Sequence, residues 1–231
     1  MSYELNPRSV AHVSVESRGA FINKTYLHLF GAITALVALE AWYFQSGIAE
    51  SIYSFLPRGA GWLLVLGVFM LVGWAASHVA HRARTLPAQY AALGGFVIAE
   101  SIILVPLLYH AMAISPDIPK QAGVATLVAF AALTAIAFIT RKDFSFLRST
   151  LIWGGFAAIG LIVMGLLFGF HLGTWFSVGM IAFAGAAVLY DTSNVLHHFS
   201  EDRYVAAGLE LFSSVALMFW YVLRFYMHSS D

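Results

Sequence analysis

The chain has 231 residues, of which 60% are hydrophobic and 10% are charged, and its formal net charge at pH 7 is zero. A soluble globular domain carries about 25% charged residues, so this composition excludes a water-soluble fold and indicates a multi-pass membrane protein whose main partner is the lipid bilayer. The balanced charge gives no reason to expect a nucleic-acid partner. The absence of cysteine excludes disulfides and thiolate chemistry.

Seven apolar segments are each long enough to cross a bilayer, which needs roughly 20 apolar residues. In chain order they are residues 25–45, 60–78, 88–111, 121–140, 150–170, 173–190 and 204–225. The pattern predicts an all-α membrane domain over residues 25–226, made of seven transmembrane helices. Residues 1–24 are expected to form a cytosolic tail that contributes no apolar surface to the core.

The distribution of basic residues predicts the orientation in the membrane, because cytoplasmic loops carry an excess of Lys and Arg. Nine of the twelve basic residues fall on the side of the N-terminus: Arg8, Arg18, Lys24, Arg82, Arg84, Arg141, Lys142, Arg148 and Arg203. The other side holds Arg58, Lys120 and Arg224. We therefore expect a cytoplasmic N-terminus and, from the odd number of spans, a C-terminus on the opposite side.

Four carboxylates lie in or at the expected spans: Glu40, Glu100, Asp191 and Glu210. Ionisable groups at membrane depth cost on the order of 2.5–3.5 kcal/mol each on insertion scales and are functional candidates by default. Burial without a basic partner favours the neutral form of an acid, which suits these groups to sensing protons or binding cations. Glu40, near the outer end of the first span, is expected to reach headgroups or water. Glu100, in mid-span, is either a buried protonated acid or part of a pathway.

The sixth span is expected to end at Tyr190, so that Asp191 begins the inner loop. There Asp191 either caps a polar turn or belongs to a functional site. Glu210 and Ser214 are four residues apart in the seventh span and therefore share one helix face. Together these residues predict an acid site where the sixth and seventh spans meet.

The histidines offer a weaker hypothesis. His78 and His81 could join His197 and His198 to bind a transition metal, but the spacing alone supports this weakly and solvated interfacial histidines are the alternative. The sequence contains no phosphate-binding loop, nucleophile elbow or zinc-protease helix. We therefore expect no resident metal, no cofactor and no enzymatic activity.

Three stretches carry a resemblance to a known family: "ITRKDFSFL" at 139–147, "VLYDTSNVLHHFSEDRYVAA" at 188–207 and "LFSSVALMFWYVLRFY" at 211–226. With the number of spans and the length of the chain, they resemble the Bax-inhibitor-1 family, also called the transmembrane BAX inhibitor motif family. The resemblance implies a seven-helix bundle in which the last helix is central and the other six surround it.

The resemblance also implies candidate site residues. Members of the family are associated with a pH-sensitive calcium leak through two acids, of which Asp191 matches the first. Ser214 stands where the calcium-leak members carry the second acid, an aspartate, and Glu210, one turn earlier, is the candidate substitute. Arg84 matches a basic residue that latches the first acid, and His110 matches a histidine of some bacterial members.

The same motifs are similar to the bacterial branch of the family that includes YccA, a modulator of the membrane protease FtsH. That similarity implies a location in the bacterial inner (plasma) membrane. Two functions remain open on the sequence. One is a pH-sensitive calcium or cation leak, with Ca²⁺ as the permeating or bound ion. The other is a non-conducting modulator that is a partner and slow substrate of an FtsH-type protease, with the N-terminal tail as its handle.

Overall fold

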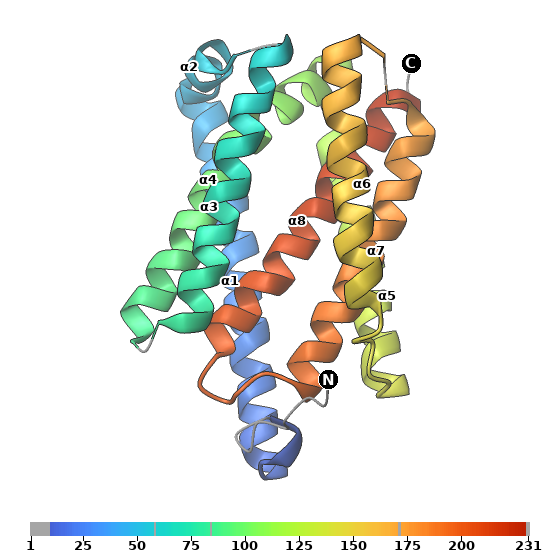
Figure 1. Ribbon diagram of the computed structural model, residues 1–231. Helices are drawn as coiled ribbons and strands as arrows, with labels where there is room; N and C mark the ends of the chain where they lie inside the picture. Colours follow the sequence, from blue (N-terminus) through green and yellow to red (C-terminus); the bar gives the residue numbers. More distant parts are fainter. Residues whose placement is uncertain (1–9, 58, 84, 171, 230–231) are drawn as a thin grey trace.

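The computed structural model describes residues 10–57, 59–83, 85–170 and 172–229, and the structural statements below refer to these residues. The described part of the chain is helical, as the sequence predicts (Figure 1). Its elements are η1 (Val10–His12), α1 (Val15–Ser46), α2 (Ile48–Phe55), η2 (Gly59–Gly61), α3 (Trp62–Arg82), α4 (Leu86–Ile114), α5 (Ile118–Thr140), α6 (Leu147–Phe168), α7 (Thr174–His197) and α8 (Tyr204–Ser229). Within the described ranges, seven helices are long and apolar enough to cross a membrane. The prediction of seven spans is confirmed.

The last helix lies at the centre of the bundle. In the most apolar 18-residue stretch of α8, 72% of the residues are buried, against 6% in the corresponding stretch of α3. Helix α8 packs against α1, α3, α4, α5 and α7, and Figure 1 shows it running between the α3–α4 pair and the α6–α7 pair. The other helices turn large apolar side chains outward, as the bilayer requires, since lipid is as apolar as a protein core.

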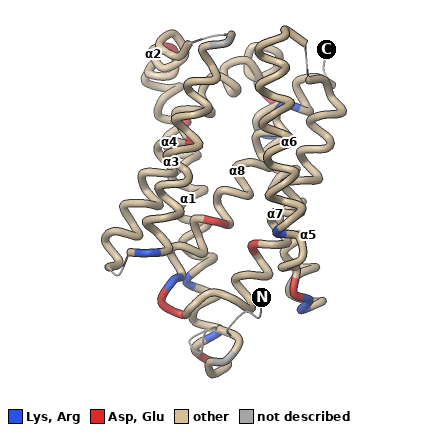
Figure 2. Tube along the Cα trace, in the orientation of Figure 1, with Lys and Arg blue, Asp and Glu red and all other residues tan. Residues whose placement is uncertain are grey.

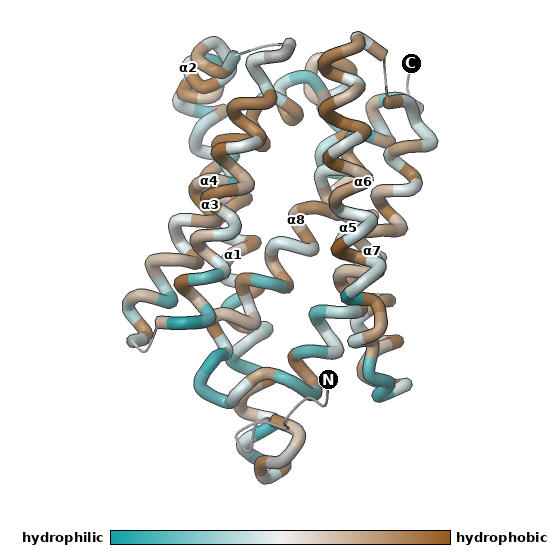
Figure 3. Tube along the Cα trace, in the orientation of Figure 1, coloured by the Kyte–Doolittle hydropathy of each residue, from teal (hydrophilic) through white to brown (hydrophobic). Residues whose placement is uncertain are grey.

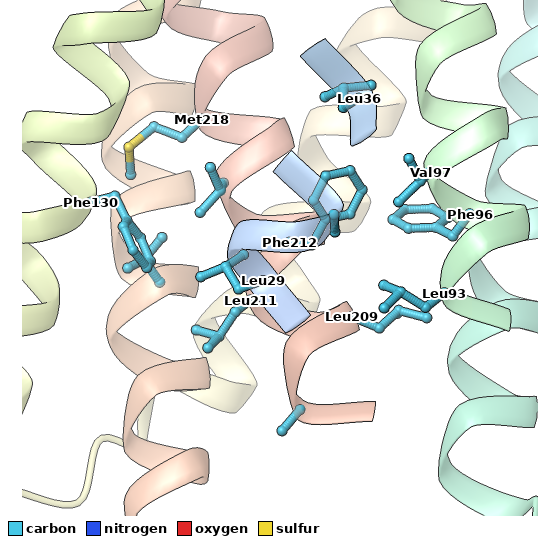
Figure 4. Close-up of a cluster of buried hydrophobic side chains, with 14 of the residues drawn as sticks. Leu29, Leu36, Leu93, Phe96, Val97, Phe130, Leu209, Leu211, Phe212 and Met218 are labelled. Atoms are coloured by element: carbon cyan, nitrogen blue, oxygen red, sulfur yellow. The ribbon is translucent and has the colours of Figure 1, made fainter. Parts of the chain in front are cut away.

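The core is formed where α1, α4, α5 and α7 meet α8 (Figure 4). Phe212 of α8 is 1% exposed and meets Phe96 of α4 edge to face, with ring centroids 5.9 Å apart. Nearby, α1 approaches α8 closely at Gly208, where an added Cβ would lie 3.1 Å from the Cβ of His28 and 3.3 Å from the carbonyl oxygen of Thr25. The missing side chain at Gly208 therefore allows the close contact between the first and last helices.

Helix α1 begins ten residues before the expected span. Its N-cap is Ser14, whose hydroxyl oxygen accepts from the N–H of Ser17 at 3.2 Å. Ahead of the cap, the backbone N–H of Val10 donates to the carbonyl of Phe199 at 2.9 Å, and the Val10 side chain is fully buried. The expectation that this part of the chain adds no apolar surface to the core is wrong for Val10, because the segment folds back against the α7–α8 connection.

The two ends of the bundle differ in charge. Figure 2 shows most charged residues at the end where α1 begins, and Figure 3 shows the hydrophilic residues gathered there too. The α3–α4, α5–α6 and α7–α8 connections lie at this end (Figure 1), while α8 finishes at the opposite end. The asymmetry agrees with the uneven distribution of basic residues in the sequence.

Candidate ion and proton site at the junction of α7 and α8

The first acid of the site, Asp191, lies inside helix α7. The expectation that Asp191 begins a loop is wrong, because α7 continues without a break to His197. The polar residues after Tyr190 face the protein interior, and Thr192 and Ser193 are completely buried. The hydroxyl of Ser193 accepts from the backbone N–H of Phe144 at 2.9 Å and so ties α7 to the α5–α6 connection. Because the Ser193 side chain is bonded to a neighbouring segment inside the protein, the helix can continue through this polar stretch.

Asp191 binds directly to α8. The carboxylate oxygen Oδ2 accepts a hydrogen bond from the Ser214 hydroxyl at 2.5 Å. Asp191 is 9% exposed and Ser214 is 6% exposed, so the bond is shielded from solvent. A hydrogen bond to a carboxylate is stronger than one between neutral groups. The predicted meeting of Asp191 with the seventh span is therefore present, with Ser214 as its partner.

Glu210 joins the same face of α8 to a third helix. Its Oε1 atom lies 3.1 Å from Nε2 of His81, near the end of α3. Both side chains are partly exposed, at 26% for Glu210 and 37% for His81. Both are also close enough to Asp191 to interact with it electrostatically. The site thus contains two acids, a hydroxyl and an imidazole, drawn from α3, α7 and α8.

The surroundings of His81 determine where its protons lie. Nδ1 is 2.8 Å from the carbonyl oxygen of Ser77, which can only accept, so Nδ1 carries hydrogen. Nε2 faces Glu210, and a neutral imidazole with hydrogen on Nδ1 has none to give an ionised carboxylate. The pair therefore holds one proton between Nε2 and Oε1, on either the imidazole or the carboxyl group. This shared proton lies close enough to Asp191 to interact with it electrostatically.

An arginine completes this end of the bundle. The Arg203 guanidinium donates from one nitrogen to the carbonyl of Ala83 at 2.6 Å and to that of Ala80 at 3.4 Å. It therefore binds the C-terminal end of α3, where a positive charge is favourable, and interacts electrostatically with His81. The predicted latch, Arg84, lies outside the described residues.

Two secondary candidates are far from this site. His110 lies at the opposite end of α4, with Nε2 3.3 Å from the hydroxyl of Tyr53 in α2. Glu100 is in the middle of α4 and is 6% exposed. The expectation that Glu40 reaches headgroups or water is wrong, because Glu40 is 8% exposed and both its carboxylate oxygens are buried. Its neighbour is Glu100, with which it interacts electrostatically.

Two other histidines of the metal hypothesis, His197 and His198, have ring centroids 6.1 Å apart but bind different partners. His197 binds the carbonyl of Ser193 through Nδ1 at 2.9 Å, while His198 binds Asp143 at 3.0 Å. Partial burial favours a higher pKa for Asp143, but hydrogen bonds from the Ser145 N–H and from His198 outweigh it and hold the pKa below its ordinary value. Among the described residues, no three His, Cys, Asp or Glu side chains are grouped to hold a metal ion.

The site can therefore bind and release protons, and it offers hard oxygen atoms to a cation. Sequence reasoning named Asp191, Glu210 and Ser214 as candidates but considered His81 only as a metal ligand or a solvated interfacial residue. The i, i+4 spacing of Ser77 and His81 is compatible with their contact, whereas nothing in the sequence pairs His81 with Glu210, which is 129 positions further along the chain.

Comparison with known proteins places these features in context. Residues 18–231 match the family model described as "Inhibitor of apoptosis-promoting Bax1". A Golgi anti-apoptotic protein of Vaccinia virus (strain Lister) is 27% identical over 224 residues, covering 94% of this chain and 88% of the viral protein. Bax inhibitor 1 of Schizosaccharomyces pombe is 27% identical over 228 residues, covering 95% of this chain and 80% of the yeast protein. A bacterial relative, an uncharacterized protein of Campylobacter jejuni, is 28% identical over 199 residues, covering 76% of this chain and 74% of the relative.

Proposed function

Because the chain belongs to the Bax inhibitor-1 family, whose members are multi-pass membrane proteins and not enzymes, we propose that it is a pH-sensitive calcium or cation leak. Asp191, Ser214 and Glu210 form its ion and proton site. The observation that carries the proposal is the buried hydrogen bond between Asp191 of α7 and Ser214 of α8, next to the proton shared by His81 and Glu210. Because Asp191 is a buried acid bound to the central helix α8, a change in its proton occupancy changes a contact that holds this helix.

In the proposed resting state, Asp191 is ionised and accepts the Ser214 hydroxyl, so that α7 and α8 are held together. Protonation removes the negative charge and weakens this charge-assisted bond. Arg84, as a further cationic latch on Asp191, stays a prediction. Acid should therefore loosen the inner end of α8 and raise the leak.

The chemistry of the site sets an expectation for calcium. Ca²⁺ takes six to eight oxygen ligands, several of them carboxylates. Here the second acid of the family pattern is replaced by Ser214, and Glu210 is engaged with His81. We expect weak calcium binding in the native chain and stronger binding when a carboxylate is restored at position 214.

The test is ion flux from purified protein in liposomes, measured between about pH 6 and 8, where perturbed acids titrate. Asp191→Asn should mimic acid and abolish most of the pH dependence. Ser214→Asp should strengthen calcium binding, because two carboxylates supply hard ligands that a hydroxyl cannot. Glu201→Gln, an exposed acid of the α7–α8 connection, is the matched control and should behave as the wild type. A flat signal for calcium and potassium at every pH would rule out the leak.

A non-conducting role as the partner and substrate of an FtsH-type membrane protease is the second candidate. It is favoured by the neutral Ser214 and by the N-terminal segment, which is bound to the end of α7. Arg18 donates to the carbonyl of Leu196 at 2.8 Å, and Val10 binds Phe199. A protease that pulled on the chain ahead of Val10 would act directly on the junction. Deletion of residues 2–9, which spares Val10, should lengthen the half-life in cells, and an unchanged half-life would count against this role.

We place the chain in the bacterial inner membrane with its N-terminus in the cytoplasm. The bacterial relatives support the compartment, and the charged end of the bundle supports the orientation. Because the chain has no cysteine, a single introduced thiol reports cleanly on sidedness. Ser145→Cys, in the exposed α5–α6 connection, should be shielded from an impermeant reagent in intact cells, whereas Ser54→Cys in α2 should react. The reverse pattern would invert the assignment.

A further inference from the structure

A second pair of acids lies inside the bundle. Glu40 of α1 is 8% exposed and Glu100 of α4 is 6% exposed, and the two interact electrostatically. Neither carboxylate oxygen of Glu40 has a hydrogen-bond partner in the part of the chain that the structure describes. Even a protonated carboxyl group keeps one donor and several acceptor positions. Burial without any partner is therefore unfavourable for Glu40 in either protonation state.

The pair is deep in the bundle. Glu100 is fourteen residues from Leu86 and from Ile114, the two ends of α4, which places it about 21 Å along the helix from either end. Glu40 lies twelve residues beyond His28, or about 18 Å along α1 from the level at which His28 meets Gly208. These acids are therefore separate from the junction site, which lies nearer the charged end of the bundle.

The two helices that carry the pair are joined by a contact between two hydroxyl groups. The Tyr43 hydroxyl lies 3.3 Å from the hydroxyl oxygen of Ser101, joining α1 to α4. Tyr43 follows Glu40 by three residues, and Ser101 is adjacent to Glu100. Both are buried, at 7% and 0% exposed. This contact holds α1 against α4 within about one helical turn of the two acids.

The pair has no cationic partner among the described residues. Neither acid takes part in an ion pair with a described side chain. On α1 and α4 themselves, the other charged or histidine side chains are Glu16, Arg18, Lys24, His28 and His110. In the α-helices packed against these two, they are Glu50 of α2, His78, His81 and Arg82 of α3, Lys120 of α5, and Glu210, Arg224 and His228 of α8. Two of these are engaged elsewhere, Glu210 with His81 and Arg224 with the carbonyl of Leu172 at 2.7 Å.

We propose that Glu40 and Glu100 form a second cation site, which takes one hard divalent metal ion in exchange for their protons. Two carboxylates balance the charge of a divalent ion, and a donor set made only of oxygen matches the preference of Ca²⁺ and Mg²⁺. Binding would supply partners to the orphaned oxygens of Glu40. Because the ion displaces protons, its affinity falls as the pH falls. The proposal is independent of the function proposed for the junction site.

The experiment measures binding of Ca²⁺, and separately of Mg²⁺, to the purified chain in detergent at pH 8 and pH 6. It uses an Asp191→Asn background, so that the junction site cannot contribute. In this background we expect one saturable ion per chain at pH 8, with proton release on binding and an affinity at least tenfold weaker at pH 6. Glu40→Gln and Glu100→Gln should each weaken binding at least tenfold. Glu50→Gln, an exposed acid in α2, should leave it unchanged.

The proposal is overturned if the Asp191→Asn chain binds neither ion, or if binding survives both Glu40→Gln and Glu100→Gln. Should a Gln variant fail to fold, Glu40→Asp provides a second test, because it keeps the charge but withdraws the carboxylate. It should weaken binding without abolishing it, and unchanged affinity would again contradict the site. Failure of the pH-dependent leak in the wild type would leave this binding intact, so the two proposals fail separately.

Discussion

The close approach of α1 and α8 at Gly208 makes a quantitative prediction. An alanine Cβ at this position would lie 3.1 Å from the Cβ of His28 and 3.3 Å from the carbonyl oxygen of Thr25. Both distances are shorter than ordinary van der Waals contact, so the two helices must separate by a few tenths of an ångström. Overpacking of this kind costs about 1–3 kcal/mol, while replacing glycine by alanine within a helix gains about 1 kcal/mol. Gly208→Ala should therefore lower the free energy of unfolding by about 0–2 kcal/mol.

Gly208→Val extends the argument, because the γ-methyl groups must enter the same space. We expect a loss of about 3 kcal/mol or more. Gly94 of α4 is the matched control, since it is exposed and a Cβ built there meets nothing within 4 Å. Gly94→Ala should raise the stability by up to about 1 kcal/mol, and Gly94→Val should change it little.

The assay is equilibrium unfolding in mixed detergent, followed by helical circular dichroism, with all four variants measured under one condition. Equal stabilities for Gly208→Val and Gly94→Val would refute the close approach of α1 to α8. Equal stabilities would also contradict the tight packing of α8 against α1 near Gly208. A loss at Gly208 that grows from alanine to valine, with none at Gly94, is the expected pattern.

Three further predictions concern the charged end of the bundle. Asp143→Asn should lower stability by no more than about 0.5 kcal/mol near neutral pH, because Asp143 is partly exposed. The pKa of Asp143 is lower in the folded state than in the unfolded state. Its contribution to stability is therefore present above the unfolded-state pKa of about 3.9 and is lost as the pH falls through the folded-state pKa. A stability difference from wild type that persists at the lowest pH would contradict this. Val10→Asp should expose the N-terminal segment to limited proteolysis, whereas Val15→Asp, at a side chain that is 90% exposed, should not; equal cleavage rates would show that Val10 is not docked. Arg203→Gln should speed amide hydrogen exchange in the last turn of α3, because it removes the hydrogen bonds to the carbonyl groups of Ala80 and Ala83. Arg82→Gln, at an exposed position, is the control and should leave exchange unchanged.

The number of helices could be predicted from the sequence because the length of an apolar run is a direct consequence of bilayer thickness. Helix ends were harder to predict. The stretch from Asp191 to Asn194 has the composition of a polar turn, yet it lies within α7. In a membrane bundle the solvent facing outward is lipid, so polar side chains gather inside. Ser193 is completely buried while Trp175 of the same helix is 87% exposed, the reverse of the soluble pattern on which turn signals depend.

The site could be predicted only in part, for a similar reason. Glu210 and Ser214 are four residues apart, so helical periodicity alone places them on one face. The contact of Glu210 with His81 joins helices distant in sequence, and no local spacing encodes it. The same holds for Glu40 and Glu100, which are sixty residues apart. Position near the end of an apolar segment suggested that Glu40 reaches water, but its actual surroundings depend on how α1 packs against α4.

The contacts of α8 explain how one charge could change the whole bundle. Along its inner half, α8 is bound to α7 through Ser214 and to α3 through Glu210, and it is packed against α1 at Gly208. The α3 contact shares a proton and is partly open to solvent, whereas the α7 contact is buried. His81 interacts electrostatically with Asp191, and a positively charged imidazole stabilises a nearby carboxylate. We therefore expect His81 to help keep Asp191 ionised and to delay the opening of the junction as the pH falls. His81→Gln removes this protection and should shift the onset of the leak to higher pH, and an onset that stays in place would show that His81 takes no part in the response.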